Sequence, residues 1–409
     1  MPEDRRRYLS RNVALLSFSA FFADAGYQAV TAVFAILLVV QMHQPAYIYG
    51  LLLAISFGAG SGFSLIGGIL GEKYGKKGIS LIGNLLIPLM SISVLFSNIY
   101  ILGALFIFGW WARYFRTPAR RAWMVEISDP AYRSNIFGFL HALDIGGGII
   151  AVSYSVVLIL VGVSLKEIIL ITSVPILVSS VCLAMAGTDE HKDYTAEKIR
   201  SETMNAQDED DPAIQKNNFI FRAIIVSATL FGFSYYAMGF PVITVSAATG
   251  SYVFGILTFG VYLSVSAFSG FLLGTLRGKK PLRTLWSLGY LLAAVSSLII
   301  GLSYAFQGGI YLYYIGAAGL GFATGSVETF EPVMIAAVTK AKKMSSGMGW
   351  LSSSRAIGLF VSNLVMGVIF VISVIGSYIY AAVTSLAAAI ILLIAELLLS
   401  DKTRQATKK

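Results

Sequence analysis

Long apolar runs separated by short polar segments dominate the chain. Residues 12–40 contain one acidic residue and no basic one, and residues 374–399 contain only Glu396 as a charged residue. A helix needs roughly 20 apolar residues to cross the hydrocarbon core of a bilayer. The pattern therefore predicts an all-α membrane protein with twelve transmembrane helices, at residues 12–40, 48–71, 79–97, 99–127, 133–163, 167–187, 218–246, 250–275, 284–305, 308–338, 344–372 and 374–399.

The composition agrees with a protein that lies in lipid. Hydrophobic residues make up 56% of the chain and charged residues only 12%, whereas soluble domains carry roughly 25% charged residues. The net charge of +9 would suggest nucleic acid as a partner of a soluble protein. Here the bases lie between apolar runs, so we expect the lipid bilayer as partner and no nucleic acid.

The placement of the bases predicts the orientation in the membrane. Lys and Arg occur at both termini, in the middle of the chain and in every second segment between spans, and Lys166 is the one exception. This is the positive-inside pattern. It predicts a multi-pass protein of the cytoplasmic membrane with both termini in the cytoplasm. The segments without bases lie around His43, Asn98, Ala247, Gln307 and Gly376.

A polar segment divides the expected helices into two sets of six. Residues 188–217 are charged, mostly acidic, and interrupt the apolar pattern. We expect an N-terminal six-helix bundle at 1–187, a cytoplasmic linker at 188–217 and a C-terminal six-helix bundle at 218–409. Transporters built from related halves have this layout, with the binding site near the midplane.

A glycine-rich, charged loop follows the second expected span. Its sequence, GGILGEKYGKKG, resembles the cytoplasmic loop signature of the major facilitator superfamily, usually written G-x-L-a-D-r-x-G-r-k. Glu72 stands where an aspartate is usual. The residues that fit the signature are Gly68, Leu70, Gly71, Lys73, Gly75, Lys76 and Lys77.

Together with the six-plus-six layout, this resemblance covers the whole chain. It implies a pseudo-twofold pair of helical bundles that transports a solute by alternating access. The segments RYFRTPARRAW from Arg113 and SNIFGFLHALDIGG from Ser134 resemble, more loosely, prokaryotic drug or sugar efflux-like permeases. Antiporters of that kind carry Gly-Pro in the fifth span, where this chain has Ile150-Ala151-Val152.

The loop itself suggests a cytoplasmic gate. Glycines at 71 and 75 permit a tight reversal between two helices. Lys76 or Lys77 can reach an acid at the end of the fourth span, Glu126 or Asp129. Such a cluster would hold the cytoplasmic side closed until the halves move. The alternative is a solvated turn that only sets the orientation.

Four ionisable residues fall near the middle of expected spans: Asp24, Arg113, Asp144 and Arg355. Charges at that depth are costly and normally face a cavity or a partner. Arg116 shares a helix face with Arg113. We expect Arg113 to pair with Asp144 or Asp24, with the acid as the group that titrates, because an arginine keeps its proton. The alternative is a fixed ion pair that joins helices.

Further candidates lie in both halves. Glu328 and Glu331 form either a second proton site or a latch with Arg277, Lys279 or Lys280. His141 lies one turn from Asp144 and either tunes it or bonds a neighbour. Aromatic side chains suit the walls of a binding site, so Tyr235 and Tyr236 are candidate substrate contacts.

These observations predict a secondary transporter rather than an enzyme. With three scattered histidines and one cysteine, the chain offers no nucleophile–base set, and we expect neither a metal nor another cofactor. We expect a monomer that couples proton movement to export of a small amphipathic organic compound. The alternatives are uptake or exchange of a small organic or inorganic anion and, more remotely, a channel or receptor.

Overall fold

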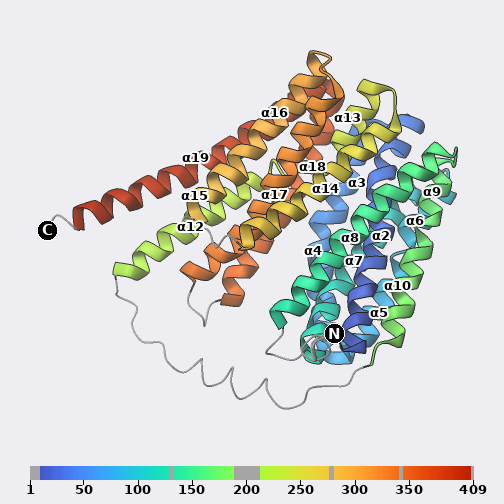
Figure 1. Cartoon of the computed structure of the whole chain (residues 1–409), viewed down its shortest axis with the longest axis horizontal. Helices are drawn as coiled ribbons and strands as arrows, with labels where there is room; N and C mark the ends of the chain where they lie inside the picture. Colours follow the sequence, from blue (N-terminus) through green and yellow to red (C-terminus); the bar gives the residue numbers. More distant parts are fainter. Residues whose placement is uncertain (1–9, 129–132, 188–211, 276–280, 340–343, 407–409) are drawn as a thin grey trace. The chain divides into compact units, whose positions relative to one another are not determined.

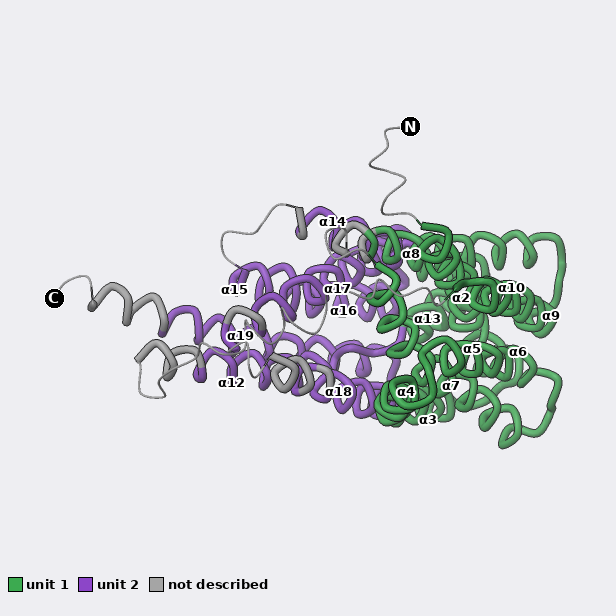
Figure 2. The backbone as a smooth tube through the Cα atoms, turned by 90° about the horizontal axis from the view of Figure 1, so that it is seen from below, with its two compact units in different colours: residues 1–198, 238–260 green, residues 199–237, 261–409 purple. Residues whose placement is uncertain are grey.

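The computed structural model describes residues 10–128, 133–187, 212–275, 281–339 and 344–406. The regular secondary structure of these residues is helical throughout (Figure 1). The chain forms two compact units (Figure 2). Unit 1 contains Met1–Lys198 and Met238–Gly260, and unit 2 contains Ile199–Ala237 and Val261–Lys409.

Within the described residues, ten helices are long and apolar enough to cross a membrane. This confirms the expected all-α membrane protein. The other two expected spans correspond to α7 (Ile99–Ile127), which carries four arginines, and to two shorter apolar helices, α12 (Pro212–Gly232) and α13 (Gly239–Thr249). Large apolar side chains are exposed along the helices, for example Leu65 at 67% and Phe271 at 74%. Lipid covers such surfaces without the cost that water would impose.

In unit 1, α2 packs against α8 and α10, while α4 and α5 both pack against α7. Short π-helical or 3-10 turns connect several elements. The remaining elements of this unit are α2 (Arg11–Ala35), η1 (Ile36–Gln41), α3 (Ala46–Ala54), η2 (Ile55–Ala59), α4 (Gly60–Tyr74), α5 (Lys76–Leu86), α6 (Leu89–Ile92), η3 (Ser93–Leu95), α8 (Arg133–Leu160), α9 (Leu165–Ile171), α10 (Ser173–Met185) and the first part of α14 (Tyr252–Thr275).

Local chemistry sets where these helices begin and turn. The Asn98 side chain accepts from the backbone N–H of Tyr100 at 2.9 Å and so caps the start of α7. Gly75 separates α4 from α5 with a φ of 97°, a backbone conformation that other residues adopt only with strain. The sharp reversal expected between the second and third spans is therefore present.

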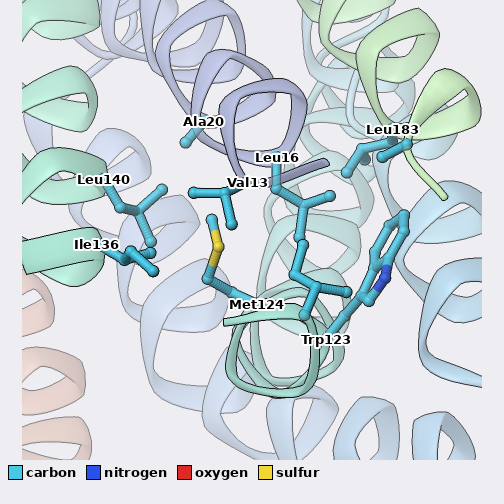
Figure 3. Packing of buried hydrophobic residues seen from close by; sticks show 10 residues of the cluster. Val13, Leu16, Ala20, Trp123, Met124, Ile136, Leu140 and Leu183 are labelled. Carbon is cyan, nitrogen blue, oxygen red and sulfur yellow. The ribbon is translucent and has the colours of Figure 1, made fainter. Parts of the chain in front are cut away.

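A cluster of buried apolar residues joins four helices of unit 1 (Figure 3). Val13 and Leu16 come from α2, Trp123 from α7, Leu140 from α8 and Leu183 from α10. Asn12 ties the same end together by accepting from the Gly187 N–H at 2.8 Å. This core fixes the ends of α7 and α10 next to the α4–α5 turn.

The expected seventh span, 218–246, is two helices rather than one. α12 ends at Gly232 and α13 begins at Gly239. Pro241 lies in the first turn of α13, where its missing N–H is tolerated. The buried side chain of Asn363 accepts from the Ala237 N–H at 3.0 Å and so satisfies the interrupted backbone. Residues 233–238 between the two helices carry Tyr235 and Tyr236.

In unit 2, α16 packs against α17 and α19, and α12 packs against α17, α18 and α19. α12 and α18 approach closely where Gly232 meets Gly358, because neither residue has a side chain. The remaining elements of this unit are the second part of α14, α15 (Pro281–Thr284), η5 (Leu285–Leu291), α16 (Leu292–Ala305), α17 (Ile310–Val338), α18 (Met344–Ile372) and α19 (Val374–Ala406).

Candidate functional site

Asp24 lies in the middle of α2 and is only 5% exposed. Its carboxylate accepts a short hydrogen bond from the Tyr27 hydroxyl, one turn along the same helix. Arg113 of α7 donates through Nη2 to the Tyr27 hydroxyl oxygen at 3.2 Å. Asp24 and Arg113, which the sequence predicts as possible partners, are thus connected through Tyr27.

Aromatic rings surround the guanidinium group of Arg113. The group lies 4.4 Å from the centre of the Tyr27 ring and 5.3 Å from that of Trp110. The Tyr114 ring lies at 5.7 Å on the same helix as Arg113. Ring faces attract a cation when water is excluded. Within the described part of the chain, ring faces and the Tyr27 hydroxyl therefore hold the charge of Arg113, and no ion pair with a carboxylate does.

Arg116, the candidate cavity residue one turn further along α7, is almost fully buried. It donates to the side-chain oxygen of Asn84 in α5. Asn84 in turn donates to Ser180 and Ser179 of α10, at 2.7 and 3.2 Å. Ser179 donates to the Ser19 carbonyl of α2 at 2.6 Å. A buried polar network therefore links four helices, and a neutral amide accepts from the cation.

Asp144 of α8 lies beside Arg120 rather than Arg113. Its Oδ1 is 3.9 Å from Nη2 of Arg120, at the outer limit of an ion pair. Among the described residues, that oxygen and the Nε of Arg120 have no hydrogen-bond partner. α8 approaches α2 closely because Gly147 packs against the Phe21 carbonyl and the Asp24 side chain. The structure thus gathers three arginines and two aspartates between α2, α7 and α8.

The α4–α5 turn is fastened to the ends of α7 and α10. Lys76 forms an ion pair with Glu126, and Lys77 donates to the Ala186 carbonyl at 2.7 Å. Glu72 is exposed and makes no ion pair with another described residue. All of these contacts lie within unit 1. Of the other loop residues, Lys73 is exposed, while Gly68 and Gly71 face Pro118 and Ala119 of α7.

In unit 2, Glu331 of α17 is fully buried and bound from two helices. Tyr290 of η5 donates to one carboxylate oxygen at 2.6 Å, and Arg355 of α18 donates through Nε to the other at 2.7 Å. Arg355 also donates to the Val327 carbonyl at 3.4 Å. The expected partners Arg277, Lys279 and Lys280 lie outside the described residues.

A small open cavity adjoins this ion pair. Phe231 and Tyr235 form one side, near the break between α12 and α13. Glu328 of α17 and the outer part of Arg355 form the other. Tyr236 points elsewhere, because its hydroxyl lies 3.2 Å from Ser297 in α16 and its ring meets Tyr378 edge-on. Of the two expected tyrosines, Tyr235 alone lines this cavity.

The remaining candidates are less closely connected. His141 is exposed on α8, and Asp129 lies outside the described residues. Sequence reasoning missed Tyr27, Asn84 and Tyr290. Tyr27 follows Asp24 at helical spacing, and Asn84 is an amide in an apolar run, so both left a signal. Tyr290 left none, since nothing in the sequence places it near Glu331.

The family model described as Major Facilitator Superfamily matches residues 16–315. No curated protein matches the chain.

Solved structures of transporters share the fold. A POT family transporter in complex with a thioalcohol-conjugated peptide is 13% identical with a TM-score of 0.74, and 96% of each chain is covered. The nucleoside transporter NupG is 11% identical with a TM-score of 0.70, covering 94% of this chain and 99% of that one. A bacterial homologue of the human lysosomal transporter Spinster is 14% identical with a TM-score of 0.68, covering 95% and 96%. On the match to the family model, the chain belongs to the major facilitator superfamily of membrane transporters.

Proposed function

We propose that this chain is a proton-coupled secondary transporter that exports a small amphipathic organic compound by alternating access. The observation that carries the proposal is the carboxylate of Asp24, buried in an apolar helix and connected to Arg113 through Tyr27. A buried ionisable group is costly in a membrane span. In this proposal the cost of burying Asp24 is offset by a function, which depends on the ability of the carboxylate to change charge.

The chemistry of this group suits proton coupling. When ionised, Asp24 accepts from Tyr27, which in turn accepts from Arg113. Protonation of Asp24 removes the negative charge that Tyr27 links to the guanidinium group of Arg113. The relative energies of the inward-open and outward-open states then change, since a ligand shifts a conformational equilibrium by its differential affinity for the two states. Arg113 stays charged throughout.

We further propose that the α4–α5 turn is a cytoplasmic latch. The ion pair of Lys76 with Glu126 and the bond from Lys77 to the end of α10 support this role, because both restrain the same ends of unit 1. Glu72 is exposed on the same turn. In this proposal both termini lie in the cytoplasm and the protein works as a monomer in the cytoplasmic membrane.

Transport in proteoliposomes tests the proposal. The purified protein is first screened by thermal unfolding against a library of compounds, and the best stabiliser becomes the transport substrate. An imposed pH gradient should drive its accumulation, and a protonophore should abolish it. Accumulation that ignores the protonophore would contradict proton coupling.

A second candidate is exchange or uptake of a small anion. Arg113, Arg116 and Arg120 outnumber the acids Asp24 and Asp144 between the same helices, and buried nitrogens of all three arginines lack a hydrogen-bond partner among the described residues. A bound carboxylate or phosphate would supply that partner. Stabilisation of the protein by anions alone in the same screen would favour this candidate.

A further inference from the structure

The cavity in unit 2 has an unequal distribution of charge. Glu331 lies behind its wall and is already bound by Tyr290 and Arg355. The Nε and Nη2 groups of Arg355 both contact Oε2 of Glu331, each at 2.7 Å. Glu328 lines the cavity, is exposed and makes no ion pair with another described residue. Two carboxylates thus stand against one guanidinium.

The opposite wall is aromatic. Phe231 and Tyr235 line the cavity with their ring centres 5.8 Å apart. Stacking on Tyr290, at 4.6 Å between ring centres, holds the Phe231 ring in place. Phe231 is at the end of α12 and Tyr235 is in the break that follows it. Ring faces stabilise an adjacent cation electrostatically as well as providing apolar contact.

We infer that this cavity binds an organic cation, with an ammonium group on Glu328 and an apolar or aromatic body against Phe231 and Tyr235. The inference rests on the proposed function, since it names the substrate class of that transporter. An anion is disfavoured because Glu331 already engages Nε and Nη2 of Arg355 and the carboxylate of Glu328 lines the same cavity.

Equilibrium binding to the full-length protein in detergent tests this inference without any gradient. Three probes share a phenyl ring and a two-carbon chain and differ in charge: 2-phenylethylammonium, 2-phenylethanol and 3-phenylpropanoate. Isothermal titration calorimetry at neutral pH should give the tightest binding for the ammonium. Equal binding of the alcohol, tighter binding of the carboxylate, or no binding of any probe to the folded protein would overturn the inference.

Variants locate the site. Glu328→Gln should weaken ammonium binding roughly 10- to 100-fold, the range for loss of a charged hydrogen-bond partner, and should leave binding of the alcohol unchanged. Glu396→Gln is the matched control, because it removes the same charge from unit 2 outside the cavity, where Glu396 accepts from Trp286 at 2.6 Å. An unchanged ammonium affinity in Glu328→Gln would overturn the inference.

Substitutions of Tyr235 test the aromatic wall of the cavity independently of Glu328. Tyr235→Phe keeps the ring and should keep the ammonium affinity, whereas Tyr235→Leu should lower it severalfold. Equal ammonium affinities of the two variants would show that the ring of Tyr235 does not contribute to binding. A failure of these binding experiments leaves proton-driven transport of another compound intact. Binding without transport would contradict the proposed function alone.

Discussion

The guanidinium group of Arg113 lies 4.4 Å from the centre of the Tyr27 ring and donates to the Tyr27 hydroxyl at 3.2 Å. The same hydroxyl donates to Asp24 on its own helix. One tyrosine therefore links Arg113 on α7 to the carboxylate of Asp24 on α2. This connection makes Tyr27 a positioning residue in the proposed mechanism.

Removal of that hydroxyl should uncouple the two charges. In Tyr27→Phe the ring still packs under Arg113, but neither hydrogen bond forms. Gradient-driven accumulation in proteoliposomes should fall at least tenfold, by analogy with loss of a hydrogen bond to a charged group, worth about 1.5–3 kcal/mol. Exchange of substrate across the membrane without a gradient should persist.

Tyr154→Phe is the control for this prediction. Tyr154 of α8 donates to the Ala25 carbonyl of α2 at 2.8 Å, so the variant removes a hydroxyl that joins α2 to another neighbouring helix, α8, without touching Asp24. Equal losses in both variants would reduce Tyr27 to a packing residue.

Loss of Arg355 should destabilise unit 2. In Arg355→Ala the Glu331 carboxylate stays buried and loses its cation. Breaking a buried pair in this way costs roughly 3 kcal/mol, the low end of the usual range because 31% of the Arg355 side chain is exposed. The thermal unfolding midpoint of the purified protein measures the effect. Glu328→Gln should leave the midpoint nearly unchanged, and an equal fall in both variants would contradict the assigned roles.

The α4–α5 turn should affect rate more than assembly. Gly75→Val forces a branched residue into a φ of 97°, with a strain of about 1–3 kcal/mol, and Glu72→Ala removes the exposed acid. Both proteins should insert at normal levels and transport more slowly. Gly78→Val provides the comparison, since a side chain there meets nothing within 4 Å. Normal transport by the Gly75 and Glu72 variants would leave the loop as a simple turn.

Cysteine labelling should report the orientation. In a Cys182→Ser background, cysteines at Tyr47 and Thr249 should react with an impermeant maleimide in intact cells. A cysteine at Gly78 should react only after permeabilisation, because the bases beside it favour the cytoplasm. The reverse pattern would overturn the proposed topology.

Hydrophobicity alone placed most of the helices. The expected spans 99–127 and 344–372 have the same bounds as α7 and α18. Apolar runs cannot reveal an interruption, however, and 218–246 was expected as one span. The break there depends on Asn363, which is distant in sequence and binds the freed backbone N–H of Ala237. Contacts between residues so distant in sequence cannot be predicted from the apolar pattern of one segment.

The sequence predicted the central charged residues of the candidate site but left their pairing open. A charge in an apolar run identifies Asp24, Arg113, Asp144 and Arg355, since membranes make each of them costly. Which acid meets which base depends on helix rotation and packing. Small residues such as Gly147, which lets α8 approach Asp24, set that packing.

Transport by Asp24→Asn in proteoliposomes tests the central claim most directly. Asparagine keeps the shape of the side chain and still accepts from Tyr27, but it cannot change charge. With the library-derived substrate and an imposed pH gradient, Asp24→Asn should fail to concentrate substrate while still exchanging it down its gradient. Asp144→Asn, measured in parallel, should retain more coupling, because Oδ1 of Asp144 lies 3.9 Å from Arg120 and has no hydrogen-bond partner among the described residues. Normal accumulation by Asp24→Asn would show that this carboxylate only joins helices and would contradict the account.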